Sequence, residues 1–376
     1  MGNIKTNRAK DFAMMLLDEA KVELNGPRPD DLQVYDERFW ETVVRDRELG
    51  LGESYQQGWW GAEHLDQLLV KILNADLKNK VKPSIGLVAF ALGSKLKNHQ
   101  TVRRAARNAS SHYDIGNDLY ERMLDKRMLY SCAYWKDAED LGAAQEAKLD
   151  LICRKLDLQP GMTLLDIGCG WGGMAAFAAE RYGAKVTAIS PALQQVTVAA
   201  KRCEGLDVDV RQQDYRDVTG KFDRIISVGM LEHVGPKNFR GFFDVNSQLL
   251  TEDGIILHHT IGSNLSKSTT DPWFDKYVFP GGVVPSMAHL GKASETNWAI
   301  EDVHNFGPDY DRTLMSWYHN IEAVWDDLPN YDEHFRRTWR YYLLSSAASF
   351  RARQLQLWQI VFRRARVVSP GYITVR

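Results

Sequence analysis

The chain has 376 residues, 44% of them hydrophobic, which is enough for one large globular domain and a smaller one. Its formal net charge of -2 at pH 7 lacks the basic excess of a general nucleic-acid binder, so we expect no nucleic-acid partner. The four cysteines form no Cys-x-x-Cys pair and have no metal-ligand spacing, which favours a reducing, cytoplasmic compartment and no metal centre.

Residues 1–105 are predicted to form a small N-terminal helical domain. Two segments in it, residues 36–49 (DERFWETVVRDREL) and 64–77 (HLDQLLVKILNADL), repeat their apolar side chains about every 3.6 residues, as amphipathic helices do. No apolar run reaches the roughly 18 residues that a membrane-spanning helix needs, so we expect no such helix.

The end of this domain is strongly basic. Between Asp76 and Asp114 the sequence has no acidic residue, and its basic residues are Lys78, Lys80, Lys82, Lys95, Lys97, Arg103, Arg104 and Arg107. An apolar segment, residues 84–93, leads into the basic stretch, residues 95–107. The pattern is typical of an interfacial helix on anionic lipid and equally typical of a solvated linker helix. On the first interpretation the domain binds lipid, and the protein associates peripherally with an anionic membrane surface.

Residues 106–376 are predicted to form an α/β domain. Short β-branched runs of strand length alternate there with helix-like segments, and the runs are residues 162–168, 184–190, 207–214, 222–230 and 254–262. Such alternation implies a doubly wound, Rossmann-like parallel sheet that binds ligands at the carboxyl ends of its strands. Residues 262–310, rich in Gly, Pro and aromatic residues, are expected to be a long insertion over that edge.

A glycine turn follows the first predicted strand, in the sequence LLDIGCGWGG at residues 164–173. Gly168 and Gly170 permit a tight turn, and a helix starting near Gly172 would present free N–H groups to a nucleotide-like ligand. The glycine spacing alone is a weak signal, because a dinucleotide-binding fold has a similar turn.

Two acidic residues favour S-adenosylmethionine as the ligand of this turn. Asp166, just before the first glycine, could bind the ligand's amino group, and Asp214 stands at the end of the third predicted strand. The acid expected for a ribose at the end of the second strand is missing. Ser190, Gln194 and Gln195 stand there instead, and they could bind hydroxyl groups without charge.

The chain resembles the family of cyclopropane-fatty-acyl-phospholipid synthases. The resemblance is carried by YSCAYW at residues 130–135, EHVGPKNF at 232–239, HHTIGS at 258–263 and HNFGPDYD at 304–311. It extends over nearly the whole chain, through LGLGESYQQGWW at residues 49–60, HYDIGNDLYERMLD at 112–125, DPWFDKYVFPGG at 271–282 and FRARQLQLWQ at 350–359.

The resemblance implies transfer of a methylene group from S-adenosylmethionine to the cis double bond of an unsaturated phospholipid acyl chain. It also implies a bound bicarbonate as proton acceptor, in a cage made by Cys132, Glu232, His259, Ile261 through its backbone, and Tyr310. The implied cofactor contacts are Tyr130, Ser131, Gly168, Ser190, Gln195 and Tyr215. The glycine turn adds Asp166 and Gly170 to them, and the end of the third strand adds Asp214. His233 is expected to be structural, and a homodimer is left open.

Two other functions remain open at this level. The first is an S-adenosylmethionine-dependent methyltransferase that makes a methyl-branched lipid or methylates a soluble small molecule. The second is a lipid-surface binding protein that has lost its chemistry. The basic stretch and the aromatic insertion favour the synthase over the soluble methyltransferase, whereas the intact acid, histidine and tyrosine favour it over the binding protein. Each residue also has a structural interpretation, since a lone Cys, His or Tyr more often packs than reacts.

Overall fold

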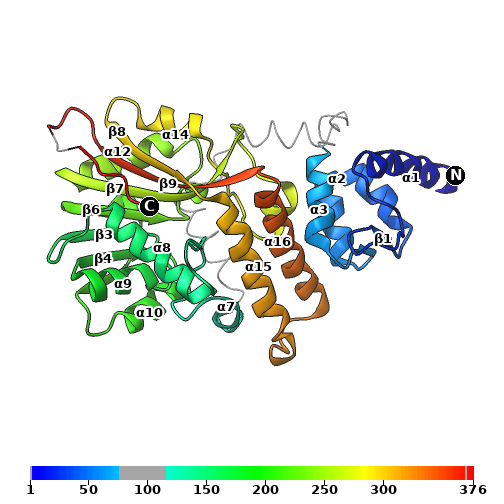
Figure 1. The fold of residues 1–376 in the computed structure, drawn as a ribbon, viewed down its shortest axis with the longest axis horizontal. Helices are drawn as coiled ribbons and strands as arrows, with labels where there is room; N and C mark the ends of the chain where they lie inside the picture. The colour runs from blue at the N-terminus through cyan, green and yellow to red at the C-terminus, as the bar shows by residue number, and fades with distance from the viewer. Residues whose placement is uncertain (1, 76–115, 369–370) are drawn as a thin grey trace. The chain divides into compact units, whose positions relative to one another are not determined.

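The computed structural model describes residues 2–75, 116–368 and 371–376 (Figure 1). The chain divides into two compact units. The helical unit comprises Met1–Lys97, Thr269–Pro280 and Leu314–Gln354, and the sheet unit comprises Asn98–Ser268, Gly281–Thr313 and Leu355–Arg376. This division differs from the two consecutive domains expected from the sequence, because residues 269–280 and 314–354 join the helical unit. The expected boundary near residue 105 and the basic stretch lie outside the described residues.

The helical unit contains the two helices predicted at its start. They are α2 (Arg38–Gln56) and α3 (Leu65–Asn74), and the other elements of the unit are α1 (Gly2–Glu19), β1 (Gln33–Val34), β2 (Trp60–Gly61), α13 (Pro272–Tyr277), η2 (Trp325–Asp327), α16 (Glu333–Arg351) and most of α15 (Gly307–Glu322). Its core is aromatic: Trp40, Trp60, Trp273 and Trp339 are almost fully buried. No helix in the described residues is long and apolar enough to cross a membrane.

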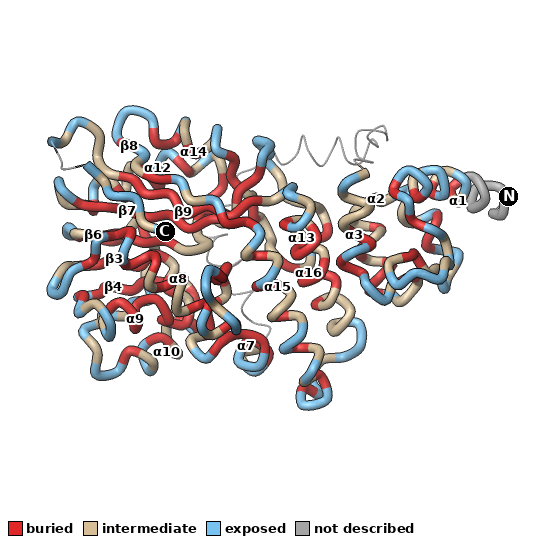
Figure 2. The backbone as a smooth tube through the Cα atoms, viewed as in Figure 1, coloured by how far each residue is buried: buried red, intermediate tan, exposed pale blue. Residues whose placement is uncertain are grey.

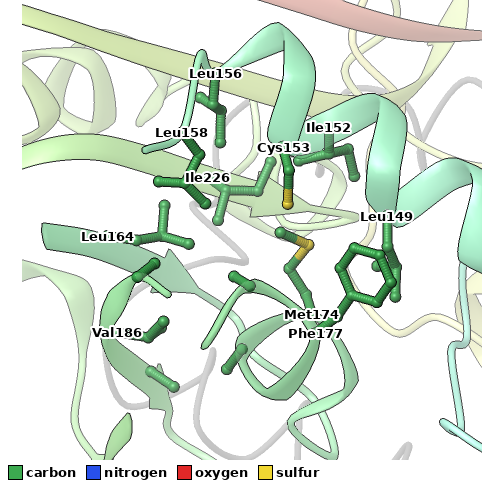
Figure 3. Packing of buried hydrophobic residues seen from close by; sticks show 14 of the residues in the cluster. Leu149, Ile152, Cys153, Leu156, Leu158, Leu164, Met174, Phe177, Val186 and Ile226 are labelled. Carbon is green, nitrogen blue, oxygen red and sulfur yellow. The ribbon is translucent and has the colours of Figure 1, made fainter. Parts of the chain in front are cut away.

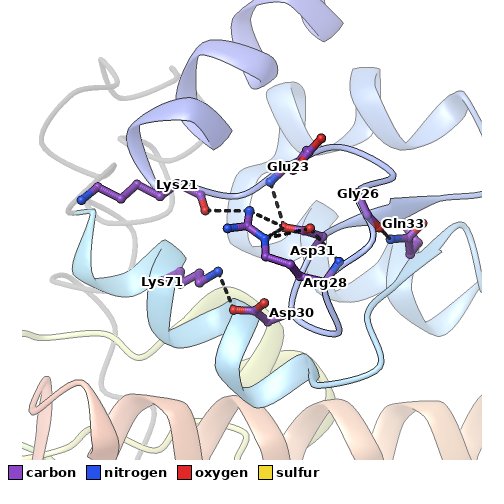
Figure 4. Close-up of polar contacts among 8 residues, drawn as sticks. All are labelled: Lys21, Glu23, Gly26, Arg28, Asp30, Asp31, Gln33 and Lys71. Carbon is purple, nitrogen blue, oxygen red and sulfur yellow. Dashed lines mark hydrogen bonds and ion pairs between the residues drawn. The ribbon is translucent and has the colours of Figure 1, made fainter.

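A charged turn between α1 and β1 is held by a buried carboxylate (Figure 4). Asp31 pairs with the Arg28 guanidinium at 2.7 Å and also accepts the backbone N–H groups of Glu23 and Arg28. Hydrogen bonds with Arg28 lower the pKa of Asp31 to about 2. Beside it, Lys71 of α3 pairs with Asp30 at 2.5 Å, so the turn is fixed to α3.

The sheet unit has a seven-stranded sheet with the strand order β5-β4-β3-β6-β7-β9-β8 (Figure 1). The strands are β3 (Thr163–Ile167), β4 (Lys185–Ser190), β5 (Val208–Gln212), β6 (Phe222–Val228), β7 (Leu250–Ser263), β8 (Trp298–Asn305) and β9 (Leu355–Arg364). The first five in this order are parallel, β9 is antiparallel to β7, and β8 is antiparallel to β9. The predicted doubly wound α/β sheet is confirmed, and part of the expected insertion, residues 298–305, is a strand of that sheet.

Helices cover both faces of this sheet, and its central strands β3, β6, β7 and β9 are buried along most of their length (Figure 2). Leu164 and Leu165 are neighbours on β3, and their side chains enter opposite cores. One core packs against α8 (Leu141–Lys155) and α9 (Gly173–Tyr182) (Figure 3). The other packs against α12 (Phe239–Leu249) and α14 (Met287–Ser294).

The remaining described elements of the sheet unit are short or peripheral. They are α7 (Asn117–Met123), α10 (Leu193–Arg202), η1 (Tyr215–Asp217) and α11 (Leu231–Val234). All four cysteines lie in the sheet unit as free, buried thiols. In the described ranges, no group of three or more His, Cys, Asp or Glu residues is arranged to hold a metal ion.

Candidate functional site

The carboxyl ends of β3, β4, β6 and β7 form one edge of the sheet, and most predicted site residues follow or end these strands. Ile167 at the end of β3 is in register with Ile189 of β4 and Ser227 of β6. Val228 at the end of β6 is in register with His259 of β7. The chain order reverses between β3 and β6, since β4 and β5 lie on one side of β3 and β6 and β7 on the other. Ligands bind at such a point in open α/β sheets.

The glycine turn connects β3 to α9 at this edge. Gly168 and Gly170 have φ angles of +84° and +53°, values that favour glycine over other residues. A Cβ atom on Gly168 would lie 3.7 Å from the Met230 sulfur, an ordinary contact, so conformation and not crowding requires this glycine. The backbone N–H of Gly168 donates to the Ile189 oxygen at 2.9 Å, which fixes the turn to β4.

Asp166 lies on β3 just before this turn, and its side chain is 1% exposed. Its Oδ2 atom has no hydrogen-bond partner among the described residues. Burial raises the pKa of Asp166 to about 7, and the nearby ammonium of Lys148 partly offsets this rise. A buried carboxylate oxygen without a donor fits a ligand that brings an ammonium group.

The residues expected near the ribose and the adenine also lie at this edge. Ser190 ends β4 and donates through Oγ to Gln195 Oε1 at 3.0 Å, and both side chains are buried. Tyr215 is buried against the edge of the Phe242 ring, with 5.0 Å between the ring centroids. Asp214 accepts two hydrogen bonds of 2.7 Å from the Arg216 guanidinium, so this predicted contact already has a cation beside it.

Residues 130–132 approach from the loop between α7 and α8. Tyr130 is partly buried against the Tyr120 ring at 5.2 Å between centroids, and Ser131 is 8% exposed. The Ser131 hydroxyl accepts a 2.9 Å hydrogen bond from Lys148, a buried residue of α8 that the motifs did not indicate. Cys132 is fully buried and donates its thiol to the Ala133 oxygen at 3.1 Å. Burial raises the pKa of the Cys132 thiol well above its usual range, so the thiol stays protonated.

Glu232 lies in α11, directly after β6, and its carboxylate is buried. Its Oε1 atom accepts the backbone N–H of Ile261 at 2.6 Å, and its Oε2 atom has no partner in the described part of the chain. The amide of Ile261 is therefore engaged by Glu232. Burial raises the pKa of Glu232 to about 7, against hydrogen bonds that lower it. This carboxyl can gain or lose a proton near neutral pH.

The two histidines at residues 258 and 259 point to different surroundings. His258 contacts the Ser227 hydroxyl at 2.8 Å and packs against Phe242 and Phe243 in the core, and its Nε2 atom, like that of His259, has no partner among the described residues. His259 Nδ1 lies 3.3 Å from Gln359 Nε2, and His259 Nε2 has no partner among the described residues. Burial holds the pKa of His259 well below its usual range, so the ring is neutral.

Tyr310 lies in the first turns of α15, which are bonded to the loop that carries Cys132. Thr313 accepts the backbone N–H of Ala133 at 3.1 Å and the indole N–H of Trp135 at 2.9 Å. The Asp309 carboxylate accepts the backbone N–H of Trp135 at 2.8 Å. Tyr310 itself is 9% exposed. These bonds join two of the elements that the sequence assigned to one cage.

Sequence reasoning missed four buried polar residues of this site: Gln145, Lys148, Thr313 and Gln359. Gln145 and Lys148 left a signal, because they lie three residues apart on the buried face of α8. A polar pair on the buried face of a helix indicates a polar interior. Thr313 and Gln359 left no comparable signal, since their partners are distant in sequence.

Comparison with known proteins places the chain among enzymes that modify lipids. The family of mycolic acid cyclopropane synthetases matches residues 100–360. The cyclopropane-fatty-acyl-phospholipid synthase of Escherichia coli strain K12 is 48% identical over 354 residues, which cover 94% of this chain and 93% of that protein. The tuberculostearic acid methyltransferase UfaA1 of Mycobacterium tuberculosis is 32% identical over 337 residues, which cover 83% of this chain and 78% of that protein.

A solved structure gives the same result for the fold. The mycolic acid cyclopropane synthase CmaA1, complexed with SAH and CTAB, matches with a TM-score of 0.64 and 30% sequence identity. The match covers 71% of this chain and 99% of that one. Because the family and the E. coli relative each match well over half of the sequence, the chain belongs to the family of mycolic acid cyclopropane synthetases.

Proposed function

We propose that the chain transfers a methylene group from S-adenosyl-L-methionine to the cis double bond of an unsaturated phospholipid acyl chain. The observation that carries this proposal is the 48% identity with the E. coli synthase over 94% of the chain. The sheet agrees with it, since solved cyclopropane synthases have a similar fold. The protein is a transferase of the S-adenosylmethionine-dependent methyltransferase class.

S-adenosylmethionine supplies an activated methyl group when it is bound at the glycine turn. The turn leaves room for backbone approach at Gly168 and Gly170, and the Asp166 carboxylate has an oxygen that still needs a donor. The residues proposed to hold the cofactor are Tyr130, Ser131, Asp166, Gly168, Gly170, Ser190, Gln195, Asp214 and Tyr215. The residues from Asp166 to Tyr215 in this set lie at or just after the carboxyl ends of β3, β4 and β5, and Ser131 is bonded to Lys148, which acts on Asp166 electrostatically.

A proton must leave the transferred carbon before a ring can close, and we assign its removal to the polar group around Glu232. The proposed cage for a bicarbonate is Cys132, Glu232, His259, Ile261 and Tyr310. A small polar anion fits this set, because Glu232 Oε2 and His259 Nε2 are buried and lack partners among the described residues. Glu232 would share a proton with it, and the neutral His259 ring would donate to it through Nε2.

A second candidate function is methyl transfer that yields a methyl-branched chain without a ring. It is favoured by the 32% identity with a protein named as a tuberculostearic acid methyltransferase. Without a reductant, loss of a proton after methyl transfer leaves this branched chain with a double bond. It then has the same formula as the cyclopropane and differs from it by a double bond in place of the ring.

The test is an incubation of the purified protein with S-adenosylmethionine and vesicles of a monounsaturated phospholipid, followed by mass spectrometry and proton NMR of the acyl chains. The expected product has gained one CH₂ unit and has lost its olefinic protons. A branched chain that has gained the same CH₂ unit but keeps a double bond, with olefinic or exocyclic methylene protons, would support the second candidate instead. Unchanged lipid would contradict both. Turnover should also fall in carbonate-free buffer and recover when bicarbonate is added. A turnover that does not depend on bicarbonate would contradict the proposed bicarbonate cage.

We further propose that residues 1–105 bind lipid and hold the protein at an anionic membrane surface. This proposal rests on the sequence, because the basic stretch lies outside the described residues. The acyl double bond lies well inside a bilayer, so an enzyme acting from the surface needs a means of attachment.

A further inference from the structure

Two buried polar residues of α8 hold the loop that carries Ser131. Lys148 is fully buried, and its Nζ atom donates to the Ser131 hydroxyl at 2.9 Å. Gln145, nearly one turn earlier, donates its amide to the backbone oxygens of Ser131 at 2.9 Å and of Leu129 at 3.2 Å. Gln145 already binds the loop backbone at two carbonyl oxygens, whereas Lys148 contacts the Ser131 side chain. The ammonium of Lys148 therefore needs a separate explanation.

Lys148 forms no ion pair with a carboxylate of the described residues. In the described ranges, no carboxylate oxygen lies within 4.0 Å of its Nζ atom. The acidic groups that act on it from further away are Asp125 and Asp166. Asp125 is already used, since its two oxygens accept the backbone N–H groups of Leu129 and Arg127. Burial lowers the pKa of Lys148 to about 8, which still leaves it mostly charged at neutral pH. A buried cation without a bonded anion is costly, so it indicates a place where an anion binds.

Asp166, at the carboxyl edge of the sheet, is a buried acidic group, whereas Lys148 is a buried basic one. The Asp166 carboxylate has one oxygen that lacks a partner in the described residues. Lys148 is the charged group that lowers its pKa, which shows that the two lie within electrostatic range, yet they form no ion pair. The site thus holds a buried positive group and a buried negative group that are both without a bonded counter-ion.

A ligand that carries both an ammonium and a carboxylate would satisfy both groups. The α-amino acid end of S-adenosylmethionine is such a group. We propose that Lys148 is a positioning residue for this end of the cofactor: it directs the Ser131 hydroxyl proton to the ligand's carboxylate, while Asp166 accepts the ligand's ammonium. This inference rests on the proposed function, because it takes S-adenosylmethionine as the ligand.

The hydrogen-bond directions agree with this assignment. An ammonium can only donate, so the Ser131 oxygen is the acceptor in its bond with Lys148. The Ser131 proton is then available for a second acceptor, and a carboxylate oxygen is a strong one. The positive charge of Lys148 behind the hydroxyl adds an attraction that a neutral side chain could not supply.

The test compares two ligands by isothermal titration calorimetry on the full-length chain. The first ligand is S-adenosylhomocysteine, and the second is its decarboxylated analogue, which keeps the amine and lacks the carboxylate. In the wild-type protein, removal of the carboxylate should weaken binding at least about tenfold, as expected for a charge-assisted hydrogen bond. Lys148→Met should weaken S-adenosylhomocysteine by at least about tenfold and should leave the analogue within about twofold of its wild-type affinity.

Lys155→Met is the matched control, because Lys155 is the other fully buried lysine of α8 and contacts His304 and Asp302 instead. It should leave both affinities within about twofold of wild type. Equal weakening of both ligands by Lys148→Met would overturn the inference and mark Lys148 as structural. If Lys148→Met does not fold, the wild-type comparison still decides, since equal affinity for the two ligands would also overturn it. A wild-type protein that binds neither ligand would instead contradict the proposed cofactor, and with it the proposed function.

Discussion

Glu232 combines two properties that a proton-transfer group needs: it is buried at the ligand edge, and its pKa lies near 7. Glu232→Gln keeps an oxygen that can accept the Ile261 N–H but cannot exchange a proton. We expect turnover to fall at least about a hundredfold, because a positioned proton-transfer group contributes roughly 10² to 10⁴. Affinity for S-adenosylhomocysteine, measured by calorimetry, should stay within about twofold of wild type.

His258→Asn is a useful control beside this variant, because His258 adjoins the site in sequence but packs into the core. It should lower Tm, and it should retain most of the turnover of the protein that remains folded. A loss of cofactor affinity as large as the loss of turnover in Glu232→Gln would mean that Glu232 shapes the site and does not move protons.

The same carboxyl makes stability depend on pH. The pKa of Glu232 rises on folding from 4.5 to about 7, chiefly through burial. A raised pKa means that the folded protein favours the neutral carboxyl, so this contribution is fully present below pH 4.5 and is lost as pH rises through 7. Relative to Glu232→Gln, the wild type should lose up to about 3 kcal/mol of stability between these limits. Urea unfolding of both proteins without cofactor, at pH 4.5 and pH 8, measures it, and a difference that is the same at both pH values would contradict it.

At the scale of elements, the site is held by a bond between a loop and the start of a helix. Thr313 of α15 accepts N–H groups from Ala133 and Trp135, which flank Tyr134 in the loop that also carries Cys132. Thr313→Val keeps the shape and removes the acceptor, so two buried donors lose their partner at about 1 to 3 kcal/mol each. We expect a lower Tm because these donors lose their partner. We also expect about a tenfold loss of turnover, because a small displacement of the loop that carries Cys132 would disturb the proposed cage.

Thr313→Ser separates the hydrogen bonds from the methyl group of Thr313. It keeps the hydroxyl, so it should recover most of the turnover that Thr313→Val loses, even if its Tm stays below that of wild type. Equal turnover in the valine and serine variants would show that packing around the methyl group, and not the acceptor, keeps this loop in place.

Most of the parallel strands could be predicted because they are apolar runs between turn residues. β3 shows why: Leu164 and Leu165 both face a core, so the run is apolar without alternation. The edge strand β8 could not, because it lies inside a segment rich in loop-forming residues and pairs with β9 near the end of the chain. Its place in the sheet depends on a partner about 50 residues away, as the Asn305 to Gln356 hydrogen bond illustrates.

The candidate site divides in the same way. The positions of Glu232 and His259 could be predicted, because Glu232 follows β6 and His259 lies on β7, and the carboxyl ends of these two strands lie at the same edge of the sheet. The partners that set their surroundings were not: Gln359 is 100 residues from His259, and Thr313 is 180 residues from Ala133. Local pattern carries no information about contacts at such separations, and only the folded chain brings these residues together.

At the scale of the whole molecule, the N-terminal segment does not complete a unit by itself. Gln56 of α2 accepts the indole N–H of Trp273 and donates to Thr338 of α16, and Asp66 of α3 pairs with Arg351. These bonds lie within the helical unit and join residues more than 200 positions apart. Removal of the first hundred residues would therefore expose the aromatic core of that unit, so attachment to membranes is better tested by substitution than by truncation.

The basic stretch gives the substitution that tests attachment. Its residues Lys95, Lys97, Arg103, Arg104 and Arg107 lie outside the described residues, and the prediction rests on their charge alone. Changing all five to Gln should remove several kcal/mol of attraction to anionic lipid, at about 1 kcal/mol for each cation near the surface. The bound fraction should fall in co-sedimentation with anionic vesicles, and wild-type binding should weaken as added salt shortens the range of the attraction.

A second five-site variant separates position from net charge. Lys126, Arg181, Lys185, Lys201 and Arg211 are exposed on the sheet unit, and their replacement by Gln changes the net charge equally. If the basic stretch faces lipid head groups, this control should sediment with anionic vesicles much as wild type does, and both variants should bind S-adenosylhomocysteine unchanged. An equal loss of vesicle binding in the two variants would show that overall net charge, and not the position of the basic stretch, determines binding. Vesicle binding that changes neither with salt nor with the first five substitutions would exclude the basic stretch as the site of attachment. Because these variants alter only charge, such a result would indicate attachment through apolar side chains.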